Sequence, residues 1–193
     1  MPQAIELVVG LGNPGAKYDR TRHNVGFWFL DALARKYDTS FRLQTKLQGE
    51  LAAARSGAGN KFYLAKPTTF MNLSGQCVAA CASYYRIAPE SVLIVHDEID
   101  LPAGTVRLKQ GGGHGGHNGL RDIAQHLGKD FPRLRIGVGD PLHPARGANF
   151  VLSAPPVAQA QDIEAAMEHV LAEFDPIVRG EIQKVMNEIN RKN

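Results

Sequence analysis

The stretch Ile5-Glu-Leu-Val-Val-Gly-Leu-Gly-Asn-Pro-Gly15, residues 5–15, joins a short apolar run directly to a glycine-rich turn. The run to Gly10 has the length and the β-branched residues of a buried strand, and glycine and proline favour a turn after it. Comparable runs at 61–65, 92–96 and 134–138 predict three more buried strands, and weaker patterns predict strands at 47–55 and 105–108. The chain therefore begins as a buried strand of a larger sheet.

Helical patterns separate these strands. Apolar spacing predicts helices over 27–37, from Ser74 to 85, over 119–127 and over 163–174, and Asp175-Pro176 is typical of the start of another that runs to about 189. Alternating strands and helices predict a single α/β domain over 1–193, with the C-terminal helices at about 156–192 part of it. Its twisted, mostly parallel, mixed sheet is expected to be covered by helices on both faces and to bind ligands at the carboxyl ends of its strands.

The composition excludes several classes of protein. A chain of 193 residues with 44% hydrophobic and 21% charged residues suits a globular domain and excludes a disordered one. Cys77 and Cys81 are expected to be reduced thiols on one helix face. Without a signal-peptide pattern or a long apolar run, we expect a cytoplasmic protein with no membrane partner. The net charge is only +3, but basic residues concentrate in 1–70 and 101–147, which favours a phosphate-bearing partner.

The turn after the first strand matches the dinucleotide fingerprint G-x-G-x-x-G. That motif needs a helix to begin within the glycines, but Pro14 removes one N–H and residues 17–22 carry no apolar stripe. We therefore favour a tight turn that approaches a ligand and presents the Asn13 amide at the end of the strand. A nucleotide-binding oxidoreductase stays open as an alternative.

His23 lies just before the predicted helix at 27–37, with Asn24 as the expected cap. The positive end of the helix dipole disfavours the imidazolium, so we expect a neutral imidazole that can take a proton from water. A carboxylate could orient it, and Asp97 in VHDEID at 95–100 is the candidate. His96 alternates with Asp97 and is expected to face the other way. The alternatives are a surface histidine and a solvated strand end that turns at Leu101-Pro102.

Two further segments carry unusual residues. The run GGGHGGHNG at 111–119 predicts a mobile loop close to a ligand and leading into a helix. His114 and His117 could bind a metal with Asp97, but they are not preorganised on glycine, and a polar gate whose Asn118 binds substrate is the alternative. The segment KPTTFMNLSG at 66–75 has two interpretations. Phe70 and Met71 could form an apolar wall of a ligand pocket with the Asn72 amide at its rim, or Phe70 and Met71 could simply pack in the core.

The segments GLGNPGxxYxxTRHNVG, KPTTFMNLSG, VHDEIDLPxG and GGGHGGHNGL, in this order and covering positions 10–120, resemble the bacterial-type peptidyl-tRNA hydrolase family. The resemblance implies a metal-free esterase without cofactor, a monomer that cleaves the ester between a peptide and the terminal ribose of tRNA. It would recycle tRNA from prematurely released peptidyl-tRNA. Its partner would be peptidyl-tRNA, contacted at the acceptor stem, the CCA end and the peptide.

The resemblance also implies roles for individual residues. His23 corresponds to the catalytic base, Asp97 to the carboxylate that stabilises its basic form, and Asn13 to the residue that separates peptidyl from free aminoacyl substrates. Substrate-contact positions fall on Tyr18, Phe70, Met71, Asn72, His117 and Asn118. Lys109 and Arg135 fall at positions linked to the 5′ phosphate of tRNA.

The residues themselves supply a chemical rationale. An ester is already activated, so water polarised by His23 and an oxyanion donor, which we assign to Asn72, suffice without a covalent intermediate. No G-x-S-x-G segment is present to supply a serine nucleophile. The Asn13 carbonyl is expected to accept a peptide N–H, whereas a free ammonium would be desolvated there without a full partner. A non-catalytic RNA-binding module, which needs only the basic segments, is the remaining alternative.

Overall fold

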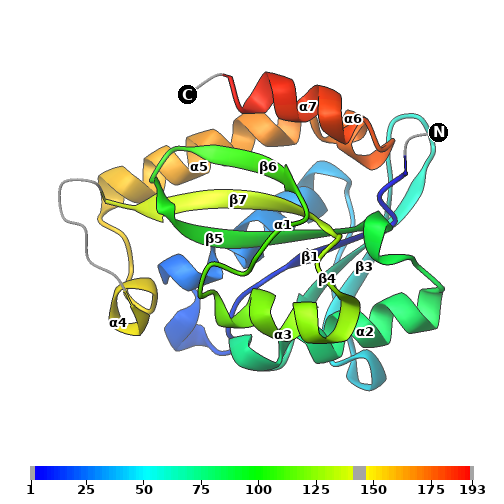
Figure 1. Cartoon of the computed structure of the whole chain (residues 1–193), viewed down its shortest axis with the longest axis horizontal. Coiled ribbons are helices and arrows are strands. Elements are labelled where there is room, and N and C mark those ends of the chain that lie inside the picture. The colour runs from blue at the N-terminus through cyan, green and yellow to red at the C-terminus, as the bar shows by residue number, and fades with distance from the viewer. Residues whose placement is uncertain (1–2, 141–146, 192–193) are drawn as a thin grey trace.

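A twisted sheet runs through the centre of the computed structural model, which describes residues 3–140 and 147–191 (Figure 1). Seven strands in these residues pair in the order β2-β3-β4-β1-β5-β7-β6. In chain order they are β1 Leu7–Gly10, β2 Arg42–Gln44, β3 Gly49–Arg55, β4 Lys61–Pro67, β5 Val92–Pro102, β6 Val106–Gln110 and β7 Pro132–Gly139.

The predicted mixed sheet is confirmed. The four central strands β4, β1, β5 and β7 are parallel, whereas β2, β3 and β6 pair antiparallel at the two edges. The short edge strand β2 was not expected, because its three residues are all exposed and form no apolar run. The expected turn at Leu101-Pro102 is wrong: β5 continues to Pro102, with irregular pairing after Glu98. The carboxylates after His96 therefore lie along a strand.

Helices cover both faces of the sheet, as predicted. α5, α6 and α7 lie on one side and α2 and α3 on the other (Figure 1). Alternate strand residues supply the two cores: Val8 packs with the face of α1, α5, α6 and α7, whereas Leu7 and Val9 pack with α2 and α3. The helices are α1 Val25–Lys36, α2 Ser74–Tyr85, α3 Asn118–Leu127, α4 Ala148–Val151, α5 Val157–Ala172, α6 Phe174–Val178 and α7 Ile182–Ile189.

Two expected helix starts differ in detail. Ser74 begins α2 but donates its hydroxyl to the carbonyl of Met71 and does not cap the helix. Asp175 lies inside α6, and its carboxylate accepts hydrogen bonds from the Tyr37 hydroxyl and the Gly57 N–H. The single expected C-terminal helix is divided into α6 and α7 around Gly180, whose φ of 84° only glycine adopts readily. Position 192 of the expected helical region lies outside the described residues.

The start of α1 lies directly against the ends of β1 and β5. A Cβ atom on Gly26 would come within 2.5 Å of the Leu11 backbone and 2.6 Å of the Val95 carbonyl oxygen. Only glycine permits this approach, because a side chain would push the helix off the sheet. The close contact brings the residues that precede α1 over the carboxyl end of β5.

Cys77 and Cys81 are buried free thiols on α2, as expected, with their sulfur atoms 4.0 Å apart. Within the described residues, every helix is too short or too polar to cross a bilayer.

Candidate active site

A histidine and a carboxylate meet at the carboxyl end of β5. His23 lies in the 3₁₀ turn η2, Arg22–Asn24, just before α1, and Asp97 lies on β5. The His23 Nδ1 atom is 2.9 Å from Asp97 Oδ1 and 3.0 Å from Oδ2. The side chains are 12% and 3% exposed, respectively. The pairing predicted for these two residues is therefore present in the fold, well shielded from solvent.

A second histidine donates a hydrogen bond to the same carboxylate, and its other hydrogen bonds show which of its two ring nitrogens carries the proton. Backbone N–H groups of Gly119 and Leu120 donate to His117 Nδ1, so this ring carries its proton on Nε2. That Nε2–H donates to Asp97 Oδ1 over 2.8 Å. Asp97 thus accepts from His117 and from the Nδ1–H of His23, which leaves Nε2 of His23 as the unprotonated nitrogen.

The carboxylate also decides the basicity of His23. Burial lowers the pKa of His23, whereas the charge of Asp97 and its hydrogen bond raise it. The two raising effects are together the larger, so the pKa of His23 lies above its usual value. The lowering expected from the helix dipole is wrong, because a full charge about 3 Å away outweighs a partial one. Burial raises the pKa of Asp97, yet the two imidazoles lower it overall, so Asp97 is ionised.

Asn24 holds the backbone of Asn13, and Met71 holds its side-chain amide. The Asn13 backbone N–H donates to Asn24 Oδ1 and the Asn24 Nδ2 group donates to the Asn13 carbonyl, both over 2.9 Å. The expected capping role of Asn24 is therefore wrong, since its side chain is used in this loop. The Met71 N–H donates to Asn13 Oδ1 over 2.8 Å. Met71 engages one lone pair of the Asn13 oxygen, and this hydrogen bond orients the Nδ2 group as a donor beside the predicted carbonyl acceptor.

The sequence around Asn13 forms no dinucleotide site. After β1 the chain makes a 3₁₀ turn, η1 Ala16–Tyr18, and α1 begins only at Val25. The glycines therefore do not open a helix whose N–H groups could hold a pyrophosphate.

A cleft of about 480 Å³ surrounds His23 and Asp97. Most of the predicted site residues line it, namely Asn13, His23, Phe70, Met71, Asn72, Asp97, His117 and Asn118. Phe70 is 56% exposed, whereas Met71 is buried, so core packing accounts for much of the Met71 side chain. The Asn118 Oδ1 atom accepts from Arg121, which orients the Asn118 amide with its Nδ2 group available to donate.

Tyr18, Lys109 and Arg135 lie outside this lining. The Tyr18 ring packs edge-on against Phe70 with centroids 6.3 Å apart, so it supports the apolar wall. Lys109 on β6 pairs with Arg133 on β7, and β-pairing places Lys109, Arg133 and Arg135 on one face of the sheet. Arg135, however, already donates from Nε and Nη2 to Glu98 Oε1, each over 3.0 Å. Lys109 and Arg135 thus share a face of the sheet, but Glu98 partly neutralises the charge of Arg135.

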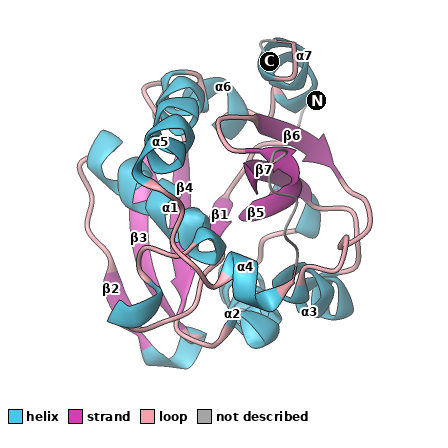
Figure 2. Ribbon diagram, turned by 90° about the vertical axis from the view of Figure 1, so that its left-hand side faces the viewer, coloured by secondary structure: helices cyan, strands magenta, loops and turns pink. Residues whose placement is uncertain are grey.

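Several residues of the site were not found from the sequence. Ala148, Val151 and Leu152 of the α4 region line the cleft, and α4 lies between α1 and α3 (Figure 2). Arg22 anchors this region by donating to Ser153 Oγ over 2.6 Å and stacking on the Phe150 ring at 4.1 Å. The stretch around α4 has no motif or long apolar stripe that could have revealed it.

The sequence also did not predict the roles of Arg133 and His96, which support residues of the site. Arg133 is buried and donates to the carbonyls of Gly112 and Gly113, which holds the glycine-rich loop. His96 is buried, with its ring 5.2 Å from that of His117, although alternation placed it away from Asp97. Burial and the neighbouring His117 lower the pKa of His96 to about 3, so it is a neutral packing partner.

Metal binding fits these residues poorly. Within the described part of the chain, His23, Asp97 and His117 bring potential ligand atoms within 4.8 Å of one another, whereas His114 is not in this group. Those atoms already share protons: Nδ1–H of His23 and Nε2–H of His117 both donate to Asp97. A metal would have to displace both protons and break the tautomer that the backbone imposes on His117.

This α/β fold, with a buried histidine–carboxylate pair at the carboxyl end of a central strand, has the site of an enzyme that works by general acid–base catalysis. The family model described as peptidyl-tRNA hydrolase matches residues 7–193. The peptidyl-tRNA hydrolase of Coxiella burnetii is 51% identical over 98% of this chain and all of its own length. That of Francisella tularensis is 48% identical over the full length of both. The chain belongs to the peptidyl-tRNA hydrolase family.

Solved structures agree with the sequence comparisons. A crystal structure of peptidyl-tRNA hydrolase from Acinetobacter baumannii superposes with a TM-score of 0.93 at 45% identity, over 98% of this chain and 96% of the other. A complex of peptidyl-tRNA hydrolase with N-propanol gives the same TM-score, identity and coverage. The α/β fold predicted from the sequence is therefore that of solved members of the family.

Proposed function

We propose that this protein hydrolyses the ester that joins a peptidyl, or N-blocked aminoacyl, group to the terminal ribose of tRNA, with His23 as the base that activates water. The observation that carries the proposal is the orientation of His23. Its Nδ1–H is bonded to ionised Asp97, so the basic Nε2 atom is the one left for the reaction in the cleft.

The reaction then needs only this chain's side chains and water. A water oxygen attacks the ester carbonyl carbon while His23 Nε2 accepts its proton, which gives a tetrahedral oxyanion and an imidazolium. Asp97 stabilises that cation over 2.9 Å. The carbon–oxygen bond to the ribose then breaks, and the imidazolium returns the proton to the leaving ribose oxygen. The products are a tRNA with its terminal hydroxyl restored and a carboxylic acid, which loses its proton to solvent water at neutral pH.

The amide side chains of the cleft supply donors for the oxyanion. Asn72 is exposed at the rim and is our candidate for the main donor, with Asn118 beside it. The Met71 N–H is less suited because it already donates to Asn13. Removing a true oxyanion donor costs about 10²- to 10³-fold in kcat, a loss large enough to separate these residues by mutation.

The orientation of Asn13 supports selection for blocked substrates. Its Nδ2 group is a donor that can bond the acyl carbonyl oxygen of a peptide. A free α-ammonium carries only donors, so it would face the Asn13 donor without an acceptor and lose part of its hydration. The cleft therefore favours an acylated amino group by leaving the charged one unpaired.

The basic face of β6 and β7 suits the terminal phosphate of the acceptor stem. Lys109 and Arg135 share this face, and a terminal phosphate carries more charge than an internal diester. The phosphate would compete with Glu98 for the Arg135 guanidinium. We expect Lys109 to contribute more to binding than Arg135 for this reason.

The test is to incubate the purified protein with N-acetyl-aminoacyl-tRNA and to measure release of the acetylated amino acid, with and without EDTA. We expect release in both conditions, and much slower release from the unblocked aminoacyl-tRNA. A His23→Asn protein is the matched control and should release little. No turnover by the wild-type protein would overturn the proposal, and loss of turnover in EDTA would overturn its metal-free mechanism.

A further inference from the structure

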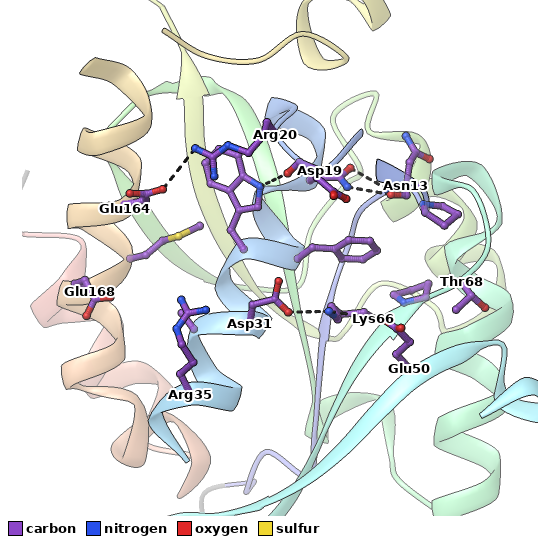
Figure 3. Close-up of a pocket in the computed structure, with 18 residues that line it drawn as sticks. Asn13, Asp19, Arg20, Asp31, Arg35, Glu50, Lys66, Thr68, Glu164 and Glu168 are labelled. Carbon is purple, nitrogen blue, oxygen red and sulfur yellow. Dashed lines mark hydrogen bonds and ion pairs between the residues drawn. The ribbon is translucent and has the colours of Figure 1, made fainter. Parts of the chain in front are cut away.

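A second cleft, of about 720 Å³, lies beside the active site and has no part in the reaction described above. α1 supplies its floor, α5 one wall, and residues from β3 and β4 the opposite wall (Figure 3). Its size is sufficient for several amino-acid side chains.

Asn13 connects the two clefts. It lines both of them, and it lies at the edge of the second cleft in Figure 3. Asn24, in the turn η2 just before α1, holds the Asn13 backbone and also lines the second cleft. The two clefts therefore adjoin at Asn13.

The floor of the second cleft is aromatic, partly exposed and held in place. Phe27 lies flat against Gly12, where an added Cβ atom would be 2.8 Å from the ring. The Trp28 indole N–H donates to the Asp19 carbonyl over 2.7 Å, and the Arg20 guanidinium covers the ring at 4.8 Å. Fixed, half-buried aromatic side chains are typical of surfaces that contact peptides.

The lining of the second cleft carries a small excess of negative charge. Acidic side chains outnumber basic ones in its lining by five to three. Ion pairs engage two of the three cations and three of the five carboxylates: Lys66 with Asp31 over 2.7 Å and with Glu50 over 3.6 Å, and Arg20 with Glu164 over 3.8 Å. The β6–β7 face of the same molecule is basic. The net charge of the second cleft therefore favours cationic side chains over phosphate groups.

From these observations, and resting on the proposed function, we infer that the second cleft binds the residues of the peptidyl chain that lie on the amino-terminal side of the ester-linked amino acid. The segment would lie extended, because an extended chain advances at most about 3.3–3.6 Å per residue and presents alternate side chains to the two walls. Lysine and arginine side chains are preferred, because the lining of the cleft, which includes Glu168 on α5, carries more negative than positive charge.

The experiment compares substrates that differ only in peptide length. All carry the same tRNA and the same ester-linked amino acid, as the N-acetyl-aminoacyl form or as peptides of two, four or six residues with Lys or Glu at the upstream positions. The quantity measured is the ratio of kcat/KM for each peptide to kcat/KM for the N-acetyl-aminoacyl form. We expect this ratio to rise with length in the wild-type protein, and to rise more with Lys than with Glu.

Glu168→Lys reverses one exposed charge on α5 in the second cleft. The ratio for Lys-containing peptides should fall by about two- to fivefold, on the scale of exposed ion pairs, and the ratio for Glu-containing peptides should rise. Glu188→Lys on α7 is the matched control, because it makes the same change of net charge at an exposed position outside the cleft. It should leave both ratios unchanged.

Trp28→Ala tests the aromatic floor and should lower the ratio for long peptides of either charge, with partial recovery in Trp28→Phe, which keeps a ring. A ratio that does not rise with length, or that responds equally to Glu168→Lys and Glu188→Lys, would overturn the assignment of the second cleft. Neither result would affect the proposed function, which fails only if the wild-type protein does not release the N-acetylated amino acid.

Discussion

Replacing Asp97 by asparagine should separate the two contributions that this carboxylate makes to His23. Asparagine keeps the size of the side chain but removes the charge and one of the two acceptor oxygens. In the wild-type protein, Asp97 accepts hydrogen bonds from both His23 and His117. The asparagine oxygen can accept from one of these imidazoles, but the asparagine Nδ2 group then faces the N–H donor of the other. We expect a well-folded protein with a weaker and less well oriented base.

The magnitude follows from the geometry. With charge centres about 4 Å apart and an effective dielectric constant of about 20, the carboxylate stabilises the imidazolium formed in the reaction by about 4 kcal/mol. At 1.36 kcal/mol per decade this corresponds to about a thousandfold. Part of the hydrogen bonding survives in the variant, so kcat/KM at its plateau should fall by about 10²- to 10³-fold.

The pH dependence has a definite sign. His23 must be neutral to accept a proton, so activity rises as the pH increases through its pKa. Asp97 raises that pKa above the usual value, so Asp97→Asn should move the acidic limb to lower pH while the plateau falls. Measuring kcat/KM from pH 5 to 9 with N-acetyl-aminoacyl-tRNA reports both effects. Asp162→Asn, at an exposed position of α5, controls for the loss of a charge. A plateau within threefold of wild type, or a limb displaced to higher pH, would refute this account of His23.

Other changes probe the remaining groups. His23→Asn should lower kcat by about 10²- to 10⁴-fold with tRNA affinity retained, as single-turnover and binding measurements would show; substantial activity in this variant would remove His23 as the base. Asn72→Ala should reduce kcat by about 10²- to 10³-fold, and a change confined to KM would assign the oxyanion donor elsewhere. Asn13→Ala should lower the ratio of turnover on acetylated to free aminoacyl-tRNA, and an unchanged ratio would contradict its selective role. Lys109→Ala should reduce the salt dependence of tRNA binding by about one unit of log–log slope and Arg135→Ala by less, because Glu98 already neutralises Arg135; equal losses on a minimal ester substrate would instead place both residues in support of the active site.

The sequence by itself was sufficient for the architecture. Apolar runs and helical spacing predicted six of the seven strands among the described residues, because each run reflects burial of a strand or one face of a helix. The carboxyl ends of parallel strands lie at one edge of a sheet, which is why Asn13 after β1 and Asp97 on β5 could be expected to meet. The exposed strand β2 and the short helix α4 carried no such pattern.

Only the tertiary structure decided the chemistry of individual atoms. Asp97, 74 residues from His23, sets its basicity and reverses the effect of the nearby helix dipole. The Met71 N–H, 58 residues from Asn13, orients the Asn13 side-chain amide by donating to its oxygen. An amide or imidazole has two orientations of similar local energy, so the choice between them falls to hydrogen-bond partners that the folded chain brings from far along the sequence.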